Sequence, residues 1–257
     1  MNMVTGQHAR RFFLALVVVV SLGTAPAAKG EVSSEILDIA ARIEFGFYSE
    51  DARAIETARS ALQLLGQPTR MSTYYDALAA YRLAQLAWAS GQRSAGVWLD
   101  DCEDSARAAE QIDRRFTEAQ IVQAACAALA ARAEPLMGIM QQRKAEKILE
   151  RVARDDPDNP RLALIRSLMV NVRPGLEIEA VAQVRIELHR ALEGFRRFDV
   201  EIGEPDWGEA EVLAHLGESY LSAGDQRRAR DLVEEALIVA PDYGFAQRLM
   251  NQVSSQH

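Results

Sequence analysis

The sequence of 257 residues predicts an all-α protein. Apolar residues recur at helical spacing (i, i+3, i+4, i+7) along most of the chain, and we find no alternating segment bounded by turn residues that would indicate a strand. The 8 prolines and 15 glycines lie mostly between the periodic segments. Hydrophobic residues make up 49% of the chain, which is enough for a continuous core.

Residues 1–27 are predicted to be a secretory signal peptide and not part of the fold. A pair of arginines precedes the apolar run 12–22, and a site of small residues predicts cleavage after Ala27. We therefore expect a periplasmic protein. The alternative is an uncleaved signal that anchors the protein in the inner membrane, although the run is short for a span. The arginine pair also resembles a twin-arginine export signal, so both export routes stay open.

The charge of the chain favours some partners over others. Cleavage would remove two basic residues and no acidic residue, so the formal net charge would change from −8 to −10. An acidic surface argues against nucleic acid and against anionic membranes, and it favours a basic protein or peptide. The alternative is that the charge only keeps an exported protein soluble.

The first half of the expected mature chain contains five predicted helices. Apolar stripes place them at 36–43, 55–65, 73–90, 95–106 and 117–140. Gly66 and Pro68 end the second helix, and Gly91 ends the third. The fifth is rich in alanine, which permits close packing between helices.

The second half continues with shorter stripes. Helices are predicted at 145–153, 160–169, 181–195, 210–222, 226–240 and 243–253. Asn159 is expected to cap the second of these, with Pro160 at its first position. Asp206 and Glu209 form a predicted capping box before the fourth. The last helix is expected to cover the open end of the stack.

The most specific pattern lies in residues 210–243, where small and large apolar residues have fixed separations along two short helices. These residues are Leu216, Gly217, Tyr220, Ala229, Val233, Ala236 and Pro241. Gly217 is expected where the two helices approach closely, and Ala229 is the small residue that faces it. Pro241 ends the second helix. This segment resembles a tetratricopeptide repeat (TPR), a unit of about 34 residues.

A partial second match covers residues 126–159. Its second helix repeats the apolar pattern of the final unit at an offset of 84 residues, so the unit between them must be longer than standard. Resemblance to TPR proteins implies that residues 28–257 form one right-handed superhelical stack of about five helical hairpins with a C-terminal capping helix. One unit cannot bury its apolar face alone, so stacked neighbours are required.

In TPR proteins the first helices of successive units line a concave surface that binds protein or peptide partners. The resemblance places seven residues on or beside that groove: Tyr74, Tyr81, Gln85, Trp88, Glu211, Glu218 and Ser222. The three aromatic residues recur every seven positions and so share one helix face. The alternative is that this aromatic stripe packs in the core. Some chaperone-binding TPR domains grip a C-terminal carboxylate with lysine and asparagine, but Ala214 and Glu218 stand at two of those places, so that activity is not implied.

The two cysteines, Cys102 and Cys126, are predicted to lie level across the hairpin formed by the fourth and fifth helices. Both continue inward-facing stripes. In an oxidising compartment this arrangement favours a disulfide. The alternative is two buried free thiols that act as small hydrophobic residues.

The sequence contains none of the motifs that would identify an enzyme. A glycine-rich phosphate loop, a G-x-S-x-G turn and an H-E-x-x-H pair are all missing, and the cysteines and histidines do not have metal-ligand spacing. We therefore predict no catalytic residue, cofactor or metal.

The predicted function is a non-catalytic scaffold or adaptor of the bacterial cell envelope that binds a protein or peptide. One alternative is a small-molecule-binding accessory subunit of an envelope transport system, and another is an enzyme with an unrecognised site. An open groove would favour a peptide, whereas closure by the long helix at 176–198 would favour a small ligand. The sequence names neither the partner nor the oligomeric state.

Overall fold

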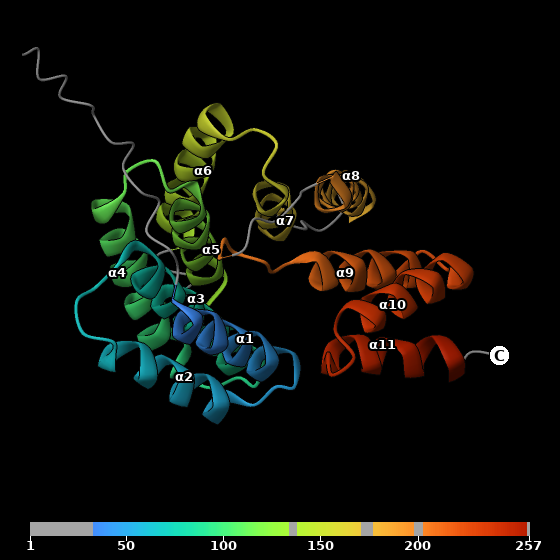
Figure 1. Cartoon of the computed structure of the whole chain (residues 1–257). Helices are drawn as coiled ribbons and strands as arrows, with labels where there is room; N and C mark the ends of the chain where they lie inside the picture. Colours follow the sequence, from blue (N-terminus) through green and yellow to red (C-terminus); the bar gives the residue numbers. More distant parts are fainter. Residues whose placement is uncertain (1–32, 134–137, 171–176, 198–202, 256–257) are drawn as a thin grey trace, which may run out of the picture. The chain divides into compact units, whose positions relative to one another are not determined.

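The computed structural model describes residues 33–133, 138–170, 177–197 and 203–255 (Figure 1). The predicted signal peptide lies outside these residues. Within them the chain forms eleven α-helices and no strand. The helices are α1 (Ser34–Tyr48), α2 (Ala52–Leu64), α3 (Arg70–Ala89), α4 (Ala95–Ile112), α5 (Thr117–Ala133), α6 (Gly138–Asp155), α7 (Pro160–Met169), α8 (Glu177–Arg197), α9 (Glu209–Ser222), α10 (Gln226–Val239) and α11 (Gly244–Ser255).

Successive helices pair into hairpins, which confirms the predicted all-α repeat fold. Each helix packs against the next within the pairs α1–α2, α3–α4, α5–α6, α7–α8 and α9–α10, and α11 packs on α10 and α9. Odd-numbered helices also pack against one another, in the contacts α1–α3, α3–α5 and α5–α7. The first helix of each unit therefore faces the inside of the stack. None of the described helices is long and apolar enough to span a bilayer.

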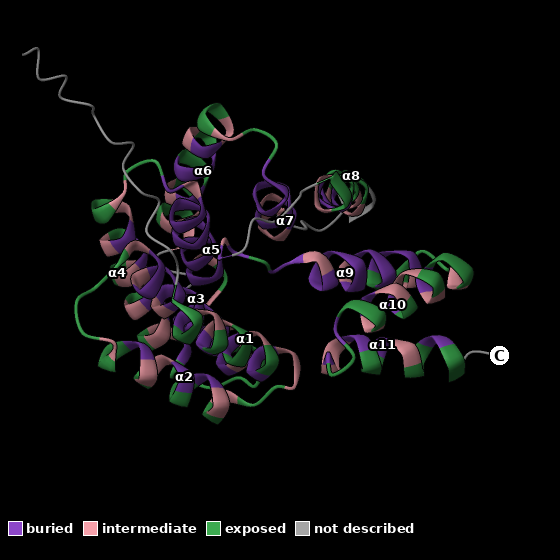
Figure 2. Ribbon diagram, viewed as in Figure 1, coloured by how far each residue is buried: buried purple, intermediate pink, exposed green. Residues whose placement is uncertain are grey.

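The middle of the stack is buried on most sides (Figure 2). Helices α3 and α5 bury most of their residues, whereas α6 and α10 bury only one stripe each. The alanines of α5 allow this, because small side chains let α3, α4, α6 and α7 approach it closely. The prediction that an alanine-rich fifth helix permits close packing is confirmed.

The prediction of one fifth helix over 117–140 is wrong. Helix α5 ends at Ala133, and α6 begins at Gly138. A Cβ atom on Gly138 would lie 2.8 Å from the backbone oxygen of Ala131, so α6 begins where it passes close to the end of α5. The offset of 84 residues therefore aligns the second helices of the two repeats, α6 and α10, but not their first helices, α5 and α9.

The predicted capping box at the start of α9 is also wrong. The N-cap residue is Gly208, which has a φ of 109° and makes no side-chain capping bond. The preceding Trp207 is 3% exposed, so the chain must turn sharply after inserting this side chain into the core. A Cβ on Gly208 would lie 2.9 Å from the Phe195 ring, which leaves room for glycine only. The predicted cap at Asn159 is confirmed, since its Oδ1 accepts from the Arg161 amide at 3.0 Å.

The residues of the TPR signature belong to the α9–α10 hairpin and the turn that follows it. Leu216, Ala229, Val233 and Ala236 are fully buried. A Cβ on Gly217 would lie 2.6 Å from Val233 Cγ2 and 3.3 Å from the Ala229 oxygen. The absence of a side chain at Gly217 therefore sets the closest approach of α9 to α10.

We expect Gly217→Leu to lower the free energy of unfolding by about 1–3 kcal/mol or more, because the leucine would force α9 and α10 apart. Thermal or denaturant unfolding measures this. Ser222→Leu is the control on the same helix; Ser222 is exposed, so its replacement should change stability by less than about 0.5 kcal/mol. An unchanged transition for Gly217→Leu would contradict the helix packing.

A disulfide joins Cys102 of α4 to Cys126 of α5, as the sequence predicted. Their Cα atoms are 6.3 Å apart, and both side chains are buried. The bridge closes a loop between residues 24 positions apart and links the second hairpin of the stack to the third.

We expect the double variant Cys102→Ala/Cys126→Ala to be less stable than the wild type by about 3 kcal/mol, since the open chain gains conformational freedom when unfolded. Denaturant unfolding with and without a reducing agent checks this. The reductant should destabilise the wild type and leave the double variant unchanged. Equal unfolding midpoints for the two proteins under oxidising conditions would refute the expected stabilisation.

Candidate functional site

One pocket receives residues from every odd-numbered helix of the described chain. It has a volume of about 370 Å³. Its residues come from the ends of α1 and α11 and from the inner faces of α3, α5, α7 and α9. The pocket therefore lies on the side of the first helices, where the TPR resemblance predicts a groove, and it is assembled from all the hairpins.

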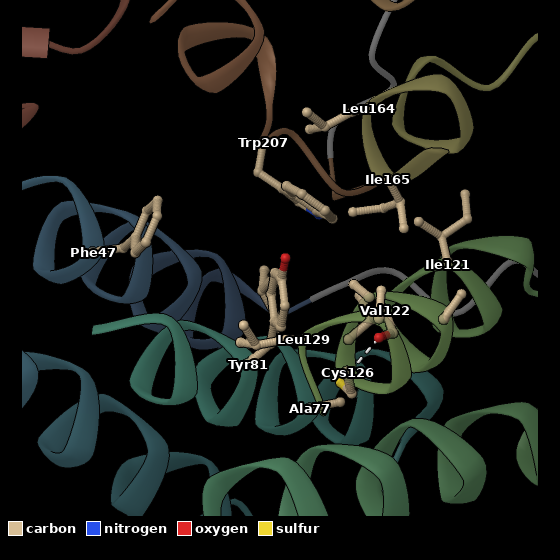
Figure 3. Close-up of a cluster of buried hydrophobic side chains, with 14 of the residues drawn as sticks. Phe47, Ala77, Tyr81, Ile121, Val122, Cys126, Leu129, Leu164, Ile165 and Trp207 are labelled. Atoms are coloured by element: carbon tan, nitrogen blue, oxygen red, sulfur yellow. Dashed lines mark hydrogen bonds between the residues drawn. The ribbon is translucent and has the colours of Figure 1, made fainter. Parts of the chain in front are cut away.

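The floor of the pocket is apolar and buried. Phe47, Tyr81, Leu129, Ile165 and Tyr243 line it, and each is less than 10% exposed. Figure 3 shows the first four of these side chains gathered in one cluster, although they come from four different helices. A rigid floor of this kind offers apolar surface without the need to order side chains on binding.

The rim of the pocket is charged and more exposed. Glu50 accepts two bonds from Arg248 of α11, at 2.9 and 2.6 Å. Across the pocket the guanidinium of Arg132 lies 5.0 Å from the ring centre of Trp88, which is 40% exposed. Glu218 lies on α9, with one carboxylate oxygen 3.5 Å from the His215 ring. A ligand on the apolar floor would therefore meet polar groups at its edges.

Contacts between the first and last helices close one side of the pocket. The rings of Tyr48 and Tyr243 are 4.9 Å apart in an edge-on arrangement, and Phe47 lies 6.2 Å from Tyr243. The pair Glu50–Arg248 lies at the same junction. The pocket is thus bounded by α1 and α11, whereas the long helix α8 contributes no described residue to it.

A buried ion cluster holds the pocket floor in place. Arg82 of α3 is fully buried and donates to both carboxylate oxygens of Glu211 of α9, at 2.8 and 2.6 Å. It also contacts Glu44 of α1 at 3.4 Å and lies 3.9 Å from the ring centre of Phe47. Burial raises the pKa of Glu44 to about 6, although the nearby Arg82 lowers it. One guanidinium therefore ties together three helices that line the pocket.

A second buried arginine fixes the segment that leads into α9. Arg161 of α7 donates to the backbone oxygens of Trp207 at 2.9 Å and Pro205 at 2.5 Å, and to Glu118 at 3.1 Å. The indole of Trp207 donates to the Tyr74 hydroxyl at 2.6 Å. Because these bonds fix residues 205–207, they also position the start of α9 and its Glu211.

The structure places the seven predicted groove residues in three environments. Five of them line the pocket, namely Tyr81, Gln85, Trp88, Glu211 and Glu218. Tyr74 is fully buried against Trp207 and lies in the core. Ser222 is exposed near the C-terminal end of α9, away from the residues that line the pocket. Whether these residues bind a partner stays a prediction.

Sequence reasoning missed several residues of the pocket. Phe47, Arg132, Tyr243 and Phe245 all line it. Aromatic residues at the end of the first helix and the start of the last were a weak signal for contact, but no local pattern shows that these two ends meet. Arg132 lies within the predicted helix 117–140, but no pattern in the sequence showed that it faces the pocket.

The described residues contain no group of three or more histidine, cysteine, aspartate or glutamate side chains arranged to hold a metal ion. His189 of α8 bonds to the Tyr220 hydroxyl at 2.9 Å. What the pocket itself offers is apolar contact, hydrogen bonding and charge.

Comparison with solved structures identifies the fold as that of a TPR protein. The chain is similar to TTC0263, a thermophilic TPR protein of Thermus thermophilus, with a TM-score of 0.53 and 17% identity, over 86% of this chain and 97% of that chain. It is also matched to the assembly chaperone of RpL4 (Acl4), with a TM-score of 0.31 and 13% identity, over 86% of this chain and 96% of that chain. The sequence matches no family model and no curated protein.

We expect the stability of the protein to depend on the titration of Glu44. Its pKa is raised from 4.5 to about 6 in the folded state, so the folded state binds this proton more tightly than the unfolded state does. The resulting contribution to stability is present below about pH 4.5 and is lost as the pH rises through about 6. Glu44→Gln removes this dependence, which amounts to about 2 kcal/mol for a shift of this size.

Denaturant unfolding of the two proteins at pH values from about 4 to about 7 measures the difference. Glu56→Gln is the control, because Glu56 is exposed on α2 and its replacement should leave the pH dependence as in the wild type. Parallel stability curves for the wild type and Glu44→Gln would contradict this role of Glu44.

Proposed function

We propose that the protein is a non-catalytic TPR scaffold of the bacterial cell envelope that binds a protein partner in the pocket formed by its odd-numbered helices. The observation that carries this proposal is the convergence of six helices on one aromatic-lined pocket. Interfaces draw most of their binding energy from a few aromatic or arginine anchors in such pockets. The fold of the similar TPR protein supports the scaffold role at the level of architecture.

The geometry supports binding by a preformed surface. The floor residues are buried in the core, and the Arg82–Glu211 pair fixes the helices that carry them. Little conformational entropy is lost when a partner enters a surface that is already ordered. Trp88 and Arg132 at the rim are exposed and can contact a partner directly.

The predicted signal peptide and the Cys102–Cys126 bridge support the proposed envelope location. Disulfides persist in oxidising compartments such as the periplasm and are rare in the cytosol. The net charge of −8 for the whole chain favours a basic partner over an anionic one. An inner-membrane anchor formed by an uncleaved signal is the alternative, and N-terminal sequencing of the exported protein distinguishes the two.

Binding of a small molecule is the second candidate function, and one observation favours it. The pocket is closed on one side by the contacts between α1 and α11, and its volume of about 370 Å³ lies at the low end of the range of small-ligand sites. Native mass spectrometry of the protein purified from the envelope tests this. A retained ligand of low molecular mass would favour the second candidate, and a co-purified protein would favour the first.

We expect Trp88→Ala to leave the fold intact and to weaken capture of the envelope partner by about tenfold or more, because Trp88 is an exposed aromatic residue at the rim. Tyr81→Ala should instead destabilise the protein by about 3–5 kcal/mol, because Tyr81 is 3% exposed and its loss leaves a cavity. Thermal unfolding and affinity capture from envelope extracts measure the two effects.

Leu64→Ala is the control for Trp88→Ala, because Leu64 is an exposed apolar residue on α2 outside the pocket. It should change neither stability nor capture. If Trp88→Ala captures the same proteins in the same amounts as the wild type, the pocket rim is not the partner-binding surface.

A further inference from the structure

One cation at the pocket has no carboxylate partner among the described residues. The side chains that line the pocket include two arginines, Arg132 and Arg248. Arg248 is held by both oxygens of Glu50. Within the part of the chain that the structure describes, no carboxylate lies within 4.0 Å of the Arg132 guanidinium. Among the described residues, Arg132 is therefore the arginine of the pocket that no carboxylate neutralises.

Trp88 holds this guanidinium over the pocket. The ring centre lies 5.0 Å from the guanidinium carbon, a distance at which the indole face attracts the cation. Arg132 also acts electrostatically on the pocket floor. Burial raises the pKa of the Tyr81 hydroxyl, and the positive charge of Arg132 opposes this rise. A guanidinium that lies over an aromatic face can still donate to a carboxylate through its N–H groups.

The carboxylates of the pocket do not compete for Arg132. Glu211 is saturated by Arg82, and Glu50 is paired with Arg248. Glu218 is 52% exposed at the rim and lies beside His215. This remaining carboxylate would repel a second negative charge on a ligand, so the pocket suits a ligand with one anionic group.

The apolar residues of the pocket floor determine the chemistry of the rest of the ligand. Between Trp88 and Ile165 the pocket is lined by Ala125, Ala128 and Leu129, which are almost fully buried. These side chains offer no hydrogen-bonding group, so a ligand that enters must place apolar atoms there. A volume of about 370 Å³ suits a compact group such as one aromatic ring with a short chain.

We propose that the pocket binds a small apolar monocarboxylic acid, with the carboxylate on Arg132 and the apolar group on the floor beside Trp88. This proposal rests on the second candidate function, the binding of a small molecule in this pocket, and it adds the chemical class of the ligand. A carboxylate can accept two parallel bonds from one guanidinium, which makes the interaction specific as well as strong.

Isothermal titration calorimetry with 3-phenylpropionate, indole-3-acetate and octanoate tests the proposal. We expect at least one of these acids to bind the wild type and Arg132→Gln to weaken that binding by about 10- to 100-fold, the loss expected for a hydrogen-bonded charged group. The corresponding alcohol should bind the wild type about as weakly as the acid binds the variant. Arg53→Gln is the matched control, because Arg53 is an exposed arginine on α2 outside the pocket.

Three results would overturn the proposal. The first is that the wild type binds none of the acids. The second is that Arg132→Gln binds them as well as the wild type does. The third is that acetyl-Gly-Gly-Phe, a peptide with a free C-terminal carboxylate, binds while the free acids do not. The last result would identify the ligand as the end of a protein chain. Arg132 is exposed, so thermal unfolding of Arg132→Gln should match that of the wild type.

The proposed scaffold function is measured separately, by capture of envelope proteins with the wild type and Trp88→Ala. If the acids do not bind but capture depends on Trp88, the scaffold function holds and the acid site does not exist. If the acids bind through Arg132 but capture is independent of Trp88, the pocket is a small-molecule site and partner binding takes place elsewhere.

Discussion

The pocket depends on the buried pair formed by Arg82 and Glu211. Both side chains are removed from water, which is costly for each charge alone, and the cost is offset only because the two bonds between them have good geometry. The pair joins residues 129 positions apart, on the second and the fifth hairpin of the stack. Removal of Arg82 would leave Glu211 as a buried charge without this partner, and removal of Glu211 would leave Arg82 with the longer contact to Glu44, so the arrangement of α3 and α9 is strongly determined.

Such long-range contacts are unusual in a repeat protein, in which each unit normally touches only its neighbours. Here Trp207, just before α9, bonds to Tyr74 of α3, and Tyr48 and Glu50 contact residues at the start of α11. The terminal units are therefore coupled to the centre by more than stacking. We expect the described part of the chain to unfold in one cooperative step, because loss of any hairpin would break contacts made by a distant one.

Local patterns predicted the fold, and distant contacts account for what they missed. The small residues Gly217 and Ala229, the cap at Asn159 and the pairing of Cys102 with Cys126 depend on neighbours within one or two helices. The turn at Gly208 depends on the burial of Trp207, whose partners Tyr74 and Arg161 come from other units. A charged residue such as Arg82 is expected on a helix surface by its type alone, and only a partner 129 positions away makes its burial possible.

The aromatic stripe of α3 shows how one helix serves stability and recognition. Sequence spacing placed Tyr74, Tyr81 and Trp88 on one face and left core and groove open as alternatives. The exposed fractions along that face are 0%, 3% and 40%, so the same stripe runs from the core to the rim of the pocket. Tyr74 is fixed by Trp207, and the exposed Arg132 lies over the ring of Trp88. The buried end of the stripe contributes to stability, and the other end contributes exposed surface. Residues at the rim can therefore be replaced, and the bound ligand changed, without loss of the fold.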